Sequence, residues 1–130
     1  MLLDSSCLLI LHQSQNVLHA QAVEYFGVAR RRVIHNYLVA EFVALIHARK
    51  IPREEGLRYA HDLVKDPTVE AFWVTKELHD AGMDLLSRRL DKTYSLCDAI
   101  SFVLMRAHGI TEALTTDHHF EQEGFTRLLR

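Results

Sequence analysis

The sequence predicts an α/β fold in which a central, mainly parallel sheet of four to five strands is covered by helices on both faces. Two observations support this fold class. Short apolar runs typical of strands alternate along the chain with longer segments whose apolar residues recur at helical spacing. The chain has 130 residues, which is enough for a core of its own, and no repeat or linker divides it. Residues 1–130 are therefore expected to form a single domain.

The helices are predicted from apolar periodicity together with their start and stop signals. They are expected over residues 5–11, 18–31, 37–49, 52–65, 75–89 and 95–108, with a further short helical piece after residue 117. Asn36, Thr75 and Ser95 each precede an apolar run and suit the N-cap. Pro52 suits a first helical turn, and Gly109 ends the helix that follows Ser95. Because the segment 37–49 is apolar nearly all round, we expect it to be buried.

The strands are short and lie between these helices. They are expected over residues 1–4, 33–35, 69–73, 113–115 and 125–128. The first strand ends in Asp4, and the third alternates apolar and polar residues as an edge strand does. In an open parallel sheet, the carboxyl ends of the strands and the adjacent helix starts line the ligand crevice. Polar residues that follow the strands are therefore candidate site residues.

Composition excludes several functional classes. With 48% hydrophobic residues, 25% charged residues and a net charge of -2, the chain has an ordinary composition and no bulk attraction for nucleic acid, so RNA binding would need local basic patches. Cys7 and Cys97 lie far apart without a metal-binding spacing, and the N-terminus does not resemble a signal sequence, which predicts a reducing cytoplasmic location. No run approaches the roughly 20 apolar residues of a membrane span.

Four acidic residues stand where apolar side chains are expected. Asp4 ends a buried strand, and Glu41 lies in the apolar helix over residues 37–49. Asp98 lies in the first turn of the helix after Ser95, and Asp117 follows the strand over residues 113–115. Buried carboxylates that gather in one place are stable only with cations or protons bound. Oxygen ligands without a cysteine set suit Mg²⁺ or Mn²⁺, which can activate water to attack a phosphodiester.

Each acid taken singly also has a structural explanation. Ser95-x-x-Asp98 resembles a capping box, with aspartate in place of the usual glutamate. Asp117 is suited to cap a short helix, and Glu41 is suited to pair with Arg49 or another basic residue. The four acids together, three of them at predicted strand ends or helix starts, favour a site.

These acids stand in four motifs that occur in a fixed order along the chain. The motifs are Leu3-Asp4-Ser5-Ser6, Val39-Ala40-Glu41-Phe42, Ser95-x-x-Asp98-Ala99 and Leu114-Thr115-Thr116-Asp117-His118-His119-Phe120. On these motifs the chain resembles the PIN domain over its whole length, and most closely the small toxin ribonucleases of VapC type. The resemblance implies a three-layer α/β/α fold in which the four acids converge on Mg²⁺ or Mn²⁺ as catalytic residues and metal ligands.

The resemblance also implies a function and partners. The expected activity is that of a metal-dependent endoribonuclease that leaves a 5′-phosphate, acting as the toxin of a toxin–antitoxin pair. A homodimer is implied, together with an antitoxin whose basic segment enters the acidic pocket. Ser6 and Thr115 would orient the carboxylates by hydrogen bonds. The RNA, whether transfer, ribosomal or messenger, is left open, because recognition depends on loop shape.

One position departs from the family pattern. Many relatives have another acid two residues after the last aspartate, where this chain has His119. That leaves open whether a second metal ion is held as tightly, or whether His119 substitutes as a ligand or proton donor. We expect His119 to be an ordinary exposed residue. The nine histidines are scattered without the HxxxH spacing of a zinc site, so solvated or packed roles are expected for them.

Basic residues supply a candidate RNA contact. Arg88, Arg89 and Lys92 precede the helix that carries Asp98 and are expected to form a basic rim beside the site. The run at residues 30–32 is expected to complement a helix dipole instead.

Two rival functions fit less well. A phosphatase of the haloacid dehalogenase type needs a second aspartate two residues after Asp4, where Ser6 stands. A non-catalytic PIN-like module for RNA binding or assembly would keep the fold and lose acids, whereas this chain has all four.

Overall fold

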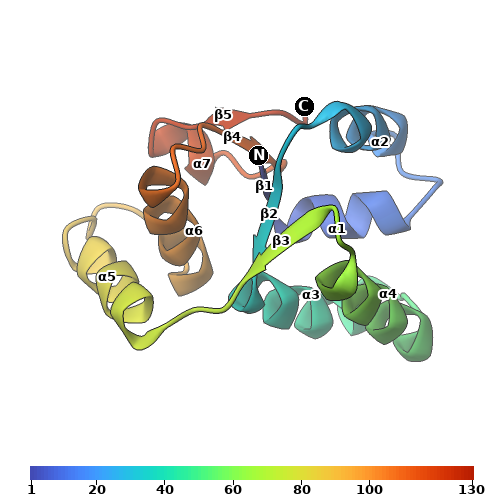
Figure 1. Ribbon diagram of the computed structural model, residues 1–130, viewed down its shortest axis with the longest axis horizontal. Coiled ribbons are helices and arrows are strands. Elements are labelled where there is room, and N and C mark those ends of the chain that lie inside the picture. The colour runs from blue at the N-terminus through green and yellow to red at the C-terminus, as the bar shows by residue number, and fades with distance from the viewer.

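The computed structural model describes all 130 residues and contains five strands and seven helices (Figure 1). The strands are β1 (Leu2–Leu3), β2 (Arg32–His35), β3 (Val69–Phe72), β4 (Glu112–Leu114) and β5 (Thr126–Arg127). The helices are α1 (Ser5–His12), α2 (His19–Val28), α3 (Asn36–Ala48), α4 (Arg53–Lys65), α5 (Lys76–Ser87), α6 (Leu96–Ala107) and α7 (His119–Gln122). Strands and helices alternate in the predicted order.

The strands form one sheet in the order β3-β2-β1-β4-β5, and every neighbouring pair is parallel. Helices α5 and α6 lie on one side of this sheet, and α1, α3 and α4 lie on the other (Figure 1). The predicted α/β/α fold is therefore confirmed, and β3 is the edge strand that its alternating sequence indicated. Because all strands are parallel, their carboxyl ends share one edge of the sheet.

Apolar side chains from both layers join in a single core of 27 buried residues. The central strand β1 contributes Leu2 and Leu3, and Phe42 of α3, Phe102 of α6 and Phe120 of α7 are completely buried. Burying such side chains stabilises the fold by roughly 1.5–3 kcal/mol each. This packing fixes α3, α6 and α7 against the sheet, and these helices carry or adjoin three of the four motif acids.

The start of α3 differs from the prediction. The side chain of His35, at the end of β2, caps this helix, since its Nδ1 accepts a hydrogen bond of 3.3 Å from the backbone N–H of Leu38. Asn36 instead accepts from the backbone N–H of Val74 at 2.6 Å. The expected Asn36 cap is wrong because β2 runs directly into α3, which leaves the last strand residue in the cap position.

His35 also ties α3 to α6. Burial lowers its pKa to about 3, so the ring is neutral, and because Nδ1 is an acceptor the proton is on Nε2. Nε2 then donates to Ser101 Oγ at 2.8 Å, and Ser101 donates to the carbonyl of Cys97 at 2.9 Å. The helix that carries Glu41 is thereby joined to the turn that carries Asp98.

Two helices are less extensive or less buried than expected. Helix α2 covers His19–Val28 only, because Ala29 has extended backbone angles and ends it. Helix α3 buries Leu38, Phe42 and Ile46 but exposes Ala40 and Ala44, so its expected burial on all sides is wrong. None of the helices combines the length and the apolar character that crossing a membrane requires.

Candidate functional site

The adjacent strands β1 and β4 bring the first and last motifs together. Leu3 pairs with Leu114, so Asp4 and Thr115 are the next residues at the carboxyl ends of these strands. Thr115 Oγ1 donates to Asp4 Oδ2 at 2.6 Å, and Ser6 Oγ donates to the same oxygen at 3.0 Å. One oxygen of the buried Asp4 carboxylate is therefore held by two hydroxyls, and the other accepts no hydrogen bond from the protein.

Asp117 lies two residues beyond Thr115, in a loop held by the same hydroxyls. Its backbone N–H donates to Thr115 Oγ1 at 3.0 Å, and the N–H of Thr116 donates to Ser6 Oγ at 3.2 Å. The carboxylate oxygen Oδ1 of Asp117 accepts from the backbone N–H of His119 at 2.9 Å, which leaves Oδ2 without a partner. The two hydroxyls thus connect the Asp4 carboxylate to the Asp117 loop.

Asp98 does form the capping box that its sequence suggested. Ser95 Oγ accepts from the backbone N–H of Asp98, and Asp98 Oδ2 accepts from the backbone N–H of Ser95, both at 3.0 Å. The cap uses only one carboxylate oxygen, because Oδ1 accepts no hydrogen bond. Capping therefore orients Asp98 and still leaves it an oxygen to offer to a ligand.

Glu41 is held by α1 and not by Arg49. Ser5 Oγ donates to Glu41 Oε1, a contact between the first turn of α1 and the second turn of α3. The alternative of an ion pair with Arg49 or another basic residue is wrong: eight residues of helix separate Glu41 from Arg49 by roughly 12 Å, and Glu41 forms no ion pair with any base. Sequence reasoning missed Ser5, although it lies between Asp4 and Ser6 in the first motif.

The charges of the four acids act on one another. Burial raises the pKa of Asp4 to about 6, against the hydrogen bonds from the two hydroxyls, and the negative charges of Glu41 and Asp98 raise it further. Burial also raises the pKa of Asp98; the N–H of Ser95 opposes this, and the charge of Asp117 adds to it. The structure thus brings the four predicted acids into one electrostatic cluster, and no lysine or arginine forms an ion pair with any of them.

Glu123 shows how this protein accommodates a buried acid that serves structure alone. Its side chain is 3% exposed and pairs with Arg89 at 2.6 Å and Arg106 at 2.5 Å. Burial opposes ionisation of Glu123, but hydrogen bonds from Arg106 and Arg89 outweigh it and lower the pKa. Because the motif acids lack such partners, their carboxylates are stabilised by a proton or by a cation from elsewhere.

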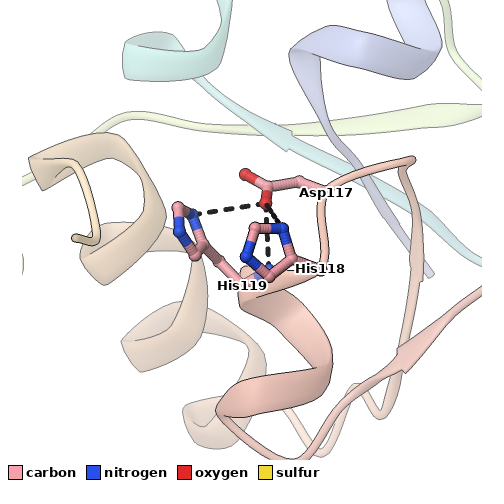
Figure 2. A group of neighbouring side chains, drawn as sticks. All are labelled: Asp117, His118 and His119. Carbon is pink, nitrogen blue, oxygen red and sulfur yellow. Dashed lines mark hydrogen bonds and ion pairs between the residues drawn. The ribbon is translucent and has the colours of Figure 1, made fainter. Parts of the chain in front are cut away.

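His119 lies inside this cluster, so the expected exposed position is wrong. Its side chain is 16% exposed, and Nδ1 lies 3.2 Å from Asp117 Oδ1 and 3.3 Å from Asp98 Oδ2 (Figure 2). The ring also contacts Tyr94 edge to face, with 5.3 Å between ring centroids. The short helix α7 begins here and turns the ring toward α6. The available signal was the position itself, two residues after the last motif acid.

The adjacent His118 is placed differently. Its ring is 62% exposed and its Nδ1 lies 3.7 Å from Asp117 Oδ1, with 4.6 Å between the centroids of the His118 and His119 rings (Figure 2). Asp117, His118 and His119 bring three potential ligand atoms within 4.8 Å of one another. The view that all nine histidines are scattered therefore missed one adjacent pair beside an aspartate.

The predicted basic rim is largely engaged in ion pairs within the chain. Arg89 contacts the buried Glu123, Arg88 lies 3.1 Å from Asp84, and Lys92 lies 3.6 Å from Asp91. Arg89 therefore has a structural partner, whereas Lys92 is paired only with an exposed neighbour. In the earlier basic run, Arg31 makes a bidentate ion pair with Glu70, with Nε donating to Oε1 at 3.0 Å and Nη2 donating to Oε2 at 2.8 Å.

The comparison with known families agrees with this arrangement. A model of the PIN domain matches residues 1–125. The chain belongs to the PIN domain family. The resemblance inferred from the four motifs is thereby confirmed. The PIN fold seen here is similar to the crystal structure of Mycobacterium tuberculosis VapC20, a Sarcin-Ricin loop cleaving toxin, with a TM-score of 0.88 and 23% sequence identity over 99% of this chain and 98% of VapC20. No match was found among curated proteins.

The donor atoms of this PIN domain suit a divalent metal ion. The four acids offer hard carboxylate oxygens, and in each of them one oxygen is held by the protein while the other has no hydrogen-bond partner. Cys97 lies beside the site, but burial raises its pKa and keeps it a neutral thiol, which is a poor ligand. Oxygen donors of this kind are those that Mg²⁺ and Mn²⁺ prefer.

Proposed function

We propose that this chain, a single PIN domain over residues 1–130, is a metal-dependent endoribonuclease and the toxin of a toxin–antitoxin pair. The observation that carries the proposal is the cluster of four carboxylates at the carboxyl end of the sheet, which has neither a lysine nor an arginine partner. Membership of the PIN family supports it, as does the likeness in fold to a toxin that cleaves RNA.

The proposed catalytic residues and metal ligands are Asp4, Glu41, Asp98 and Asp117. A bound Mg²⁺ or Mn²⁺ supplies a Lewis acid for the phosphate oxygens and lowers the pKa of a water molecule that attacks phosphorus. The acids contribute rigid positions, because each is held through one oxygen and presents the other. For Asp4 this orientation comes from Ser6 and Thr115.

RNA and a protein partner are proposed on the same basis. VapC20 cleaves the Sarcin-Ricin loop, so a structured ribosomal hairpin is the first RNA to test with this chain, followed by transfer and messenger RNA. The concentration of negative charge also suits the basic segment of an antitoxin, which would compete with the metal ion. We further propose that the chain forms a homodimer, as the family resemblance implies.

Substitution of Asp98 tests the proposal most directly. Asp98→Asn should reduce RNA cleavage by more than roughly 100-fold, because it removes a charge from the site. The fold should persist, since the amide oxygen can still accept from the N–H of Ser95 and the backbone half of the cap is unchanged. Cleavage is measured on a labelled hairpin with Mn²⁺ and with EDTA, and folding by circular dichroism.

A matched control is Asp62→Asn, which changes an exposed aspartate on α4 and should leave cleavage unaltered. Undiminished cleavage by folded Asp98→Asn protein would contradict the assignment. A small phosphate ester is included as a second substrate, because hydrolysis of the ester without cleavage of RNA would indicate a phosphatase. Failure to cleave any RNA with Mn²⁺ present would favour a non-catalytic module.

A further inference from the structure

One ring nitrogen in the site has no protein partner. Nδ1 of His119 is buried and lies within 3.3 Å of two carboxylate oxygens, from Asp98 and Asp117, yet it forms a hydrogen bond to neither. At this separation, the direction of the ring nitrogen and not its distance prevents a hydrogen bond. The nitrogen therefore lies close to both carboxylates without being aimed at either one.

The opposite side of the ring explains how Nδ1 can be a bare acceptor. Nε2 of His119 lies 3.0 Å from Thr93 Oγ1, so an Nε2 proton has an acceptor there. That tautomer leaves a lone pair on Nδ1, which faces negatively charged oxygens. The two oxygens, Asp98 Oδ2 and Asp117 Oδ1, each accept one backbone N–H and keep a second lone pair. Together with Nδ1 they make three electron-rich atoms that a cation would stabilise. The ring is held in this orientation by Tyr94 on its edge.

The distances match the spacing of ligands around a small cation. Donors at about 2.1 Å from an ion in octahedral geometry lie roughly 3.0 Å from their neighbours in the shell. Nδ1 is 3.2 and 3.3 Å from the two oxygens, which is close to that spacing. His118 does not meet this condition, because its Nδ1 is 3.7 Å from Asp117 and its ring is 62% exposed.

From this geometry we infer that His119 is a metal ligand, so that the site holds its divalent ion with imidazole as well as carboxylate. The inference deepens the proposed function and depends on it for the presence of the ion. Imidazole is a poor substitute for oxygen toward Mg²⁺, whereas first-row transition metals accept it readily. The site therefore selects Mn²⁺ over Mg²⁺ more strongly than one built of carboxylates alone.

The ligand can be observed without measuring activity. Pulsed electron paramagnetic resonance of the Mn²⁺-loaded protein should show the nitrogen coupling of a directly bound imidazole, and labelling histidine with ¹⁵N should replace the ¹⁴N pattern. His119→Gln should abolish this coupling and weaken Mn²⁺ binding about tenfold or more, with a smaller change for Mg²⁺ measured by competition. Circular dichroism checks the fold of the variant. The nitrogen coupling itself is measured on the ¹⁵N-labelled native chain, so that measurement does not depend on whether a variant folds.

Two histidine variants serve as controls. His61→Gln changes an exposed residue on α4, and His118→Gln changes the neighbour of His119; both should keep the nitrogen coupling and the Mn²⁺ affinity. Bound Mn²⁺ without nitrogen coupling would overturn the inference and leave the nuclease proposal intact. The same holds if the coupling is lost in His118→Gln and kept in His119→Gln. Failure of the native chain to bind Mn²⁺ would overturn both the ligand and the metal site, and the RNA assay reports separately on cleavage.

Discussion

Removing the charge of Asp4 should stabilise the metal-free protein at neutral pH. The folded state raises the pKa of this carboxyl from 3.8 to about 6, mainly through burial. A raised carboxyl pKa means that the contribution of Asp4 to stability is fully present below about pH 4 and is lost as the pH rises through about 6. Two pKa units at 1.36 kcal/mol each make the ionised form about 3 kcal/mol less favourable in the fold.

Asp4→Asn is suited to measure this quantity. Both hydroxyl donors, Ser6 and Thr115, contact the same oxygen, so the amide oxygen of asparagine can accept both hydrogen bonds while its NH₂ group occupies the other position. Hydrogen bonds to a charged oxygen are stronger than those to an amide, which reduces the expected gain. At pH 7.5 in EDTA, Asp4→Asn should therefore raise the free energy of unfolding by about 2 kcal/mol.

The assay is urea unfolding followed by circular dichroism at pH 7.5 and pH 4.5. The gain from Asp4→Asn should shrink toward zero at the lower pH, while the exposed control Asp62→Asn should change stability by less than about 0.5 kcal/mol at either pH. With saturating Mn²⁺, the native chain should become more stable than Asp4→Asn. An ion at 100 times its Kd adds about 2.7 kcal/mol to the free energy of unfolding of a chain that binds it, and Asp4→Asn binds the ion more weakly. A variant that is no more stable than the native chain at pH 7.5 in EDTA would refute the reasoning.

Two further predictions concern the paired charges outside the cluster. Glu123→Gln should have the opposite sign and lower the free energy of unfolding by roughly 2 kcal/mol at pH 7, because it removes the negative charge between Arg89 and Arg106 and replaces one of their two acceptor oxygens with an NH₂ donor. Since the folded state lowers the pKa of Glu123, this difference should be present above pH 4.5 and disappear as the pH falls further, which urea unfolding across pH would detect. Lys92→Ala should weaken RNA binding in filter-binding titrations and reduce by about 0.7 the slope of log binding constant against log salt concentration, whereas Arg89→Ala should mainly lower stability. Equal slopes for native and Lys92→Ala protein would contradict a phosphate contact.

Patterns within a few residues predicted most of the fold and the acids of the candidate site. Strand and helix positions follow from periodicity and capping signals, and these depend on neighbours along the chain. The capping box at Ser95 and Asp98 is one example, because both halves of it lie within a single helical turn. The resemblance to the family's motifs added the expectation that the four acids meet, and of the four only Asp4 and Asp117 lie between a strand and the next helix.

The residues that sequence reasoning misjudged have partners far along the chain. Arg89 was expected at an RNA-binding rim, but it donates to Glu123, the residue that follows the C-terminal end of α7. An ion pair of Glu41 with Arg49 was an alternative suggested by the sequence, but the structure shows Ser5 of α1 donating a hydrogen bond to Glu41. His119 was expected in solvent and instead contacts the first turn of α6. In each case the packing of one helix against another selects the partner, and no local pattern records it.

The sequence by itself determined the α/β alternation and the presence of four acids in the order of a PIN domain, because backbone periodicity and motif spacing are local properties of the chain. Only the tertiary structure decided that these acids have no lysine or arginine beside them and that an imidazole joins them. Coulomb interactions and desolvation depend on distance and burial in three dimensions, and those are set when α3, α6 and α7 pack around the end of the sheet.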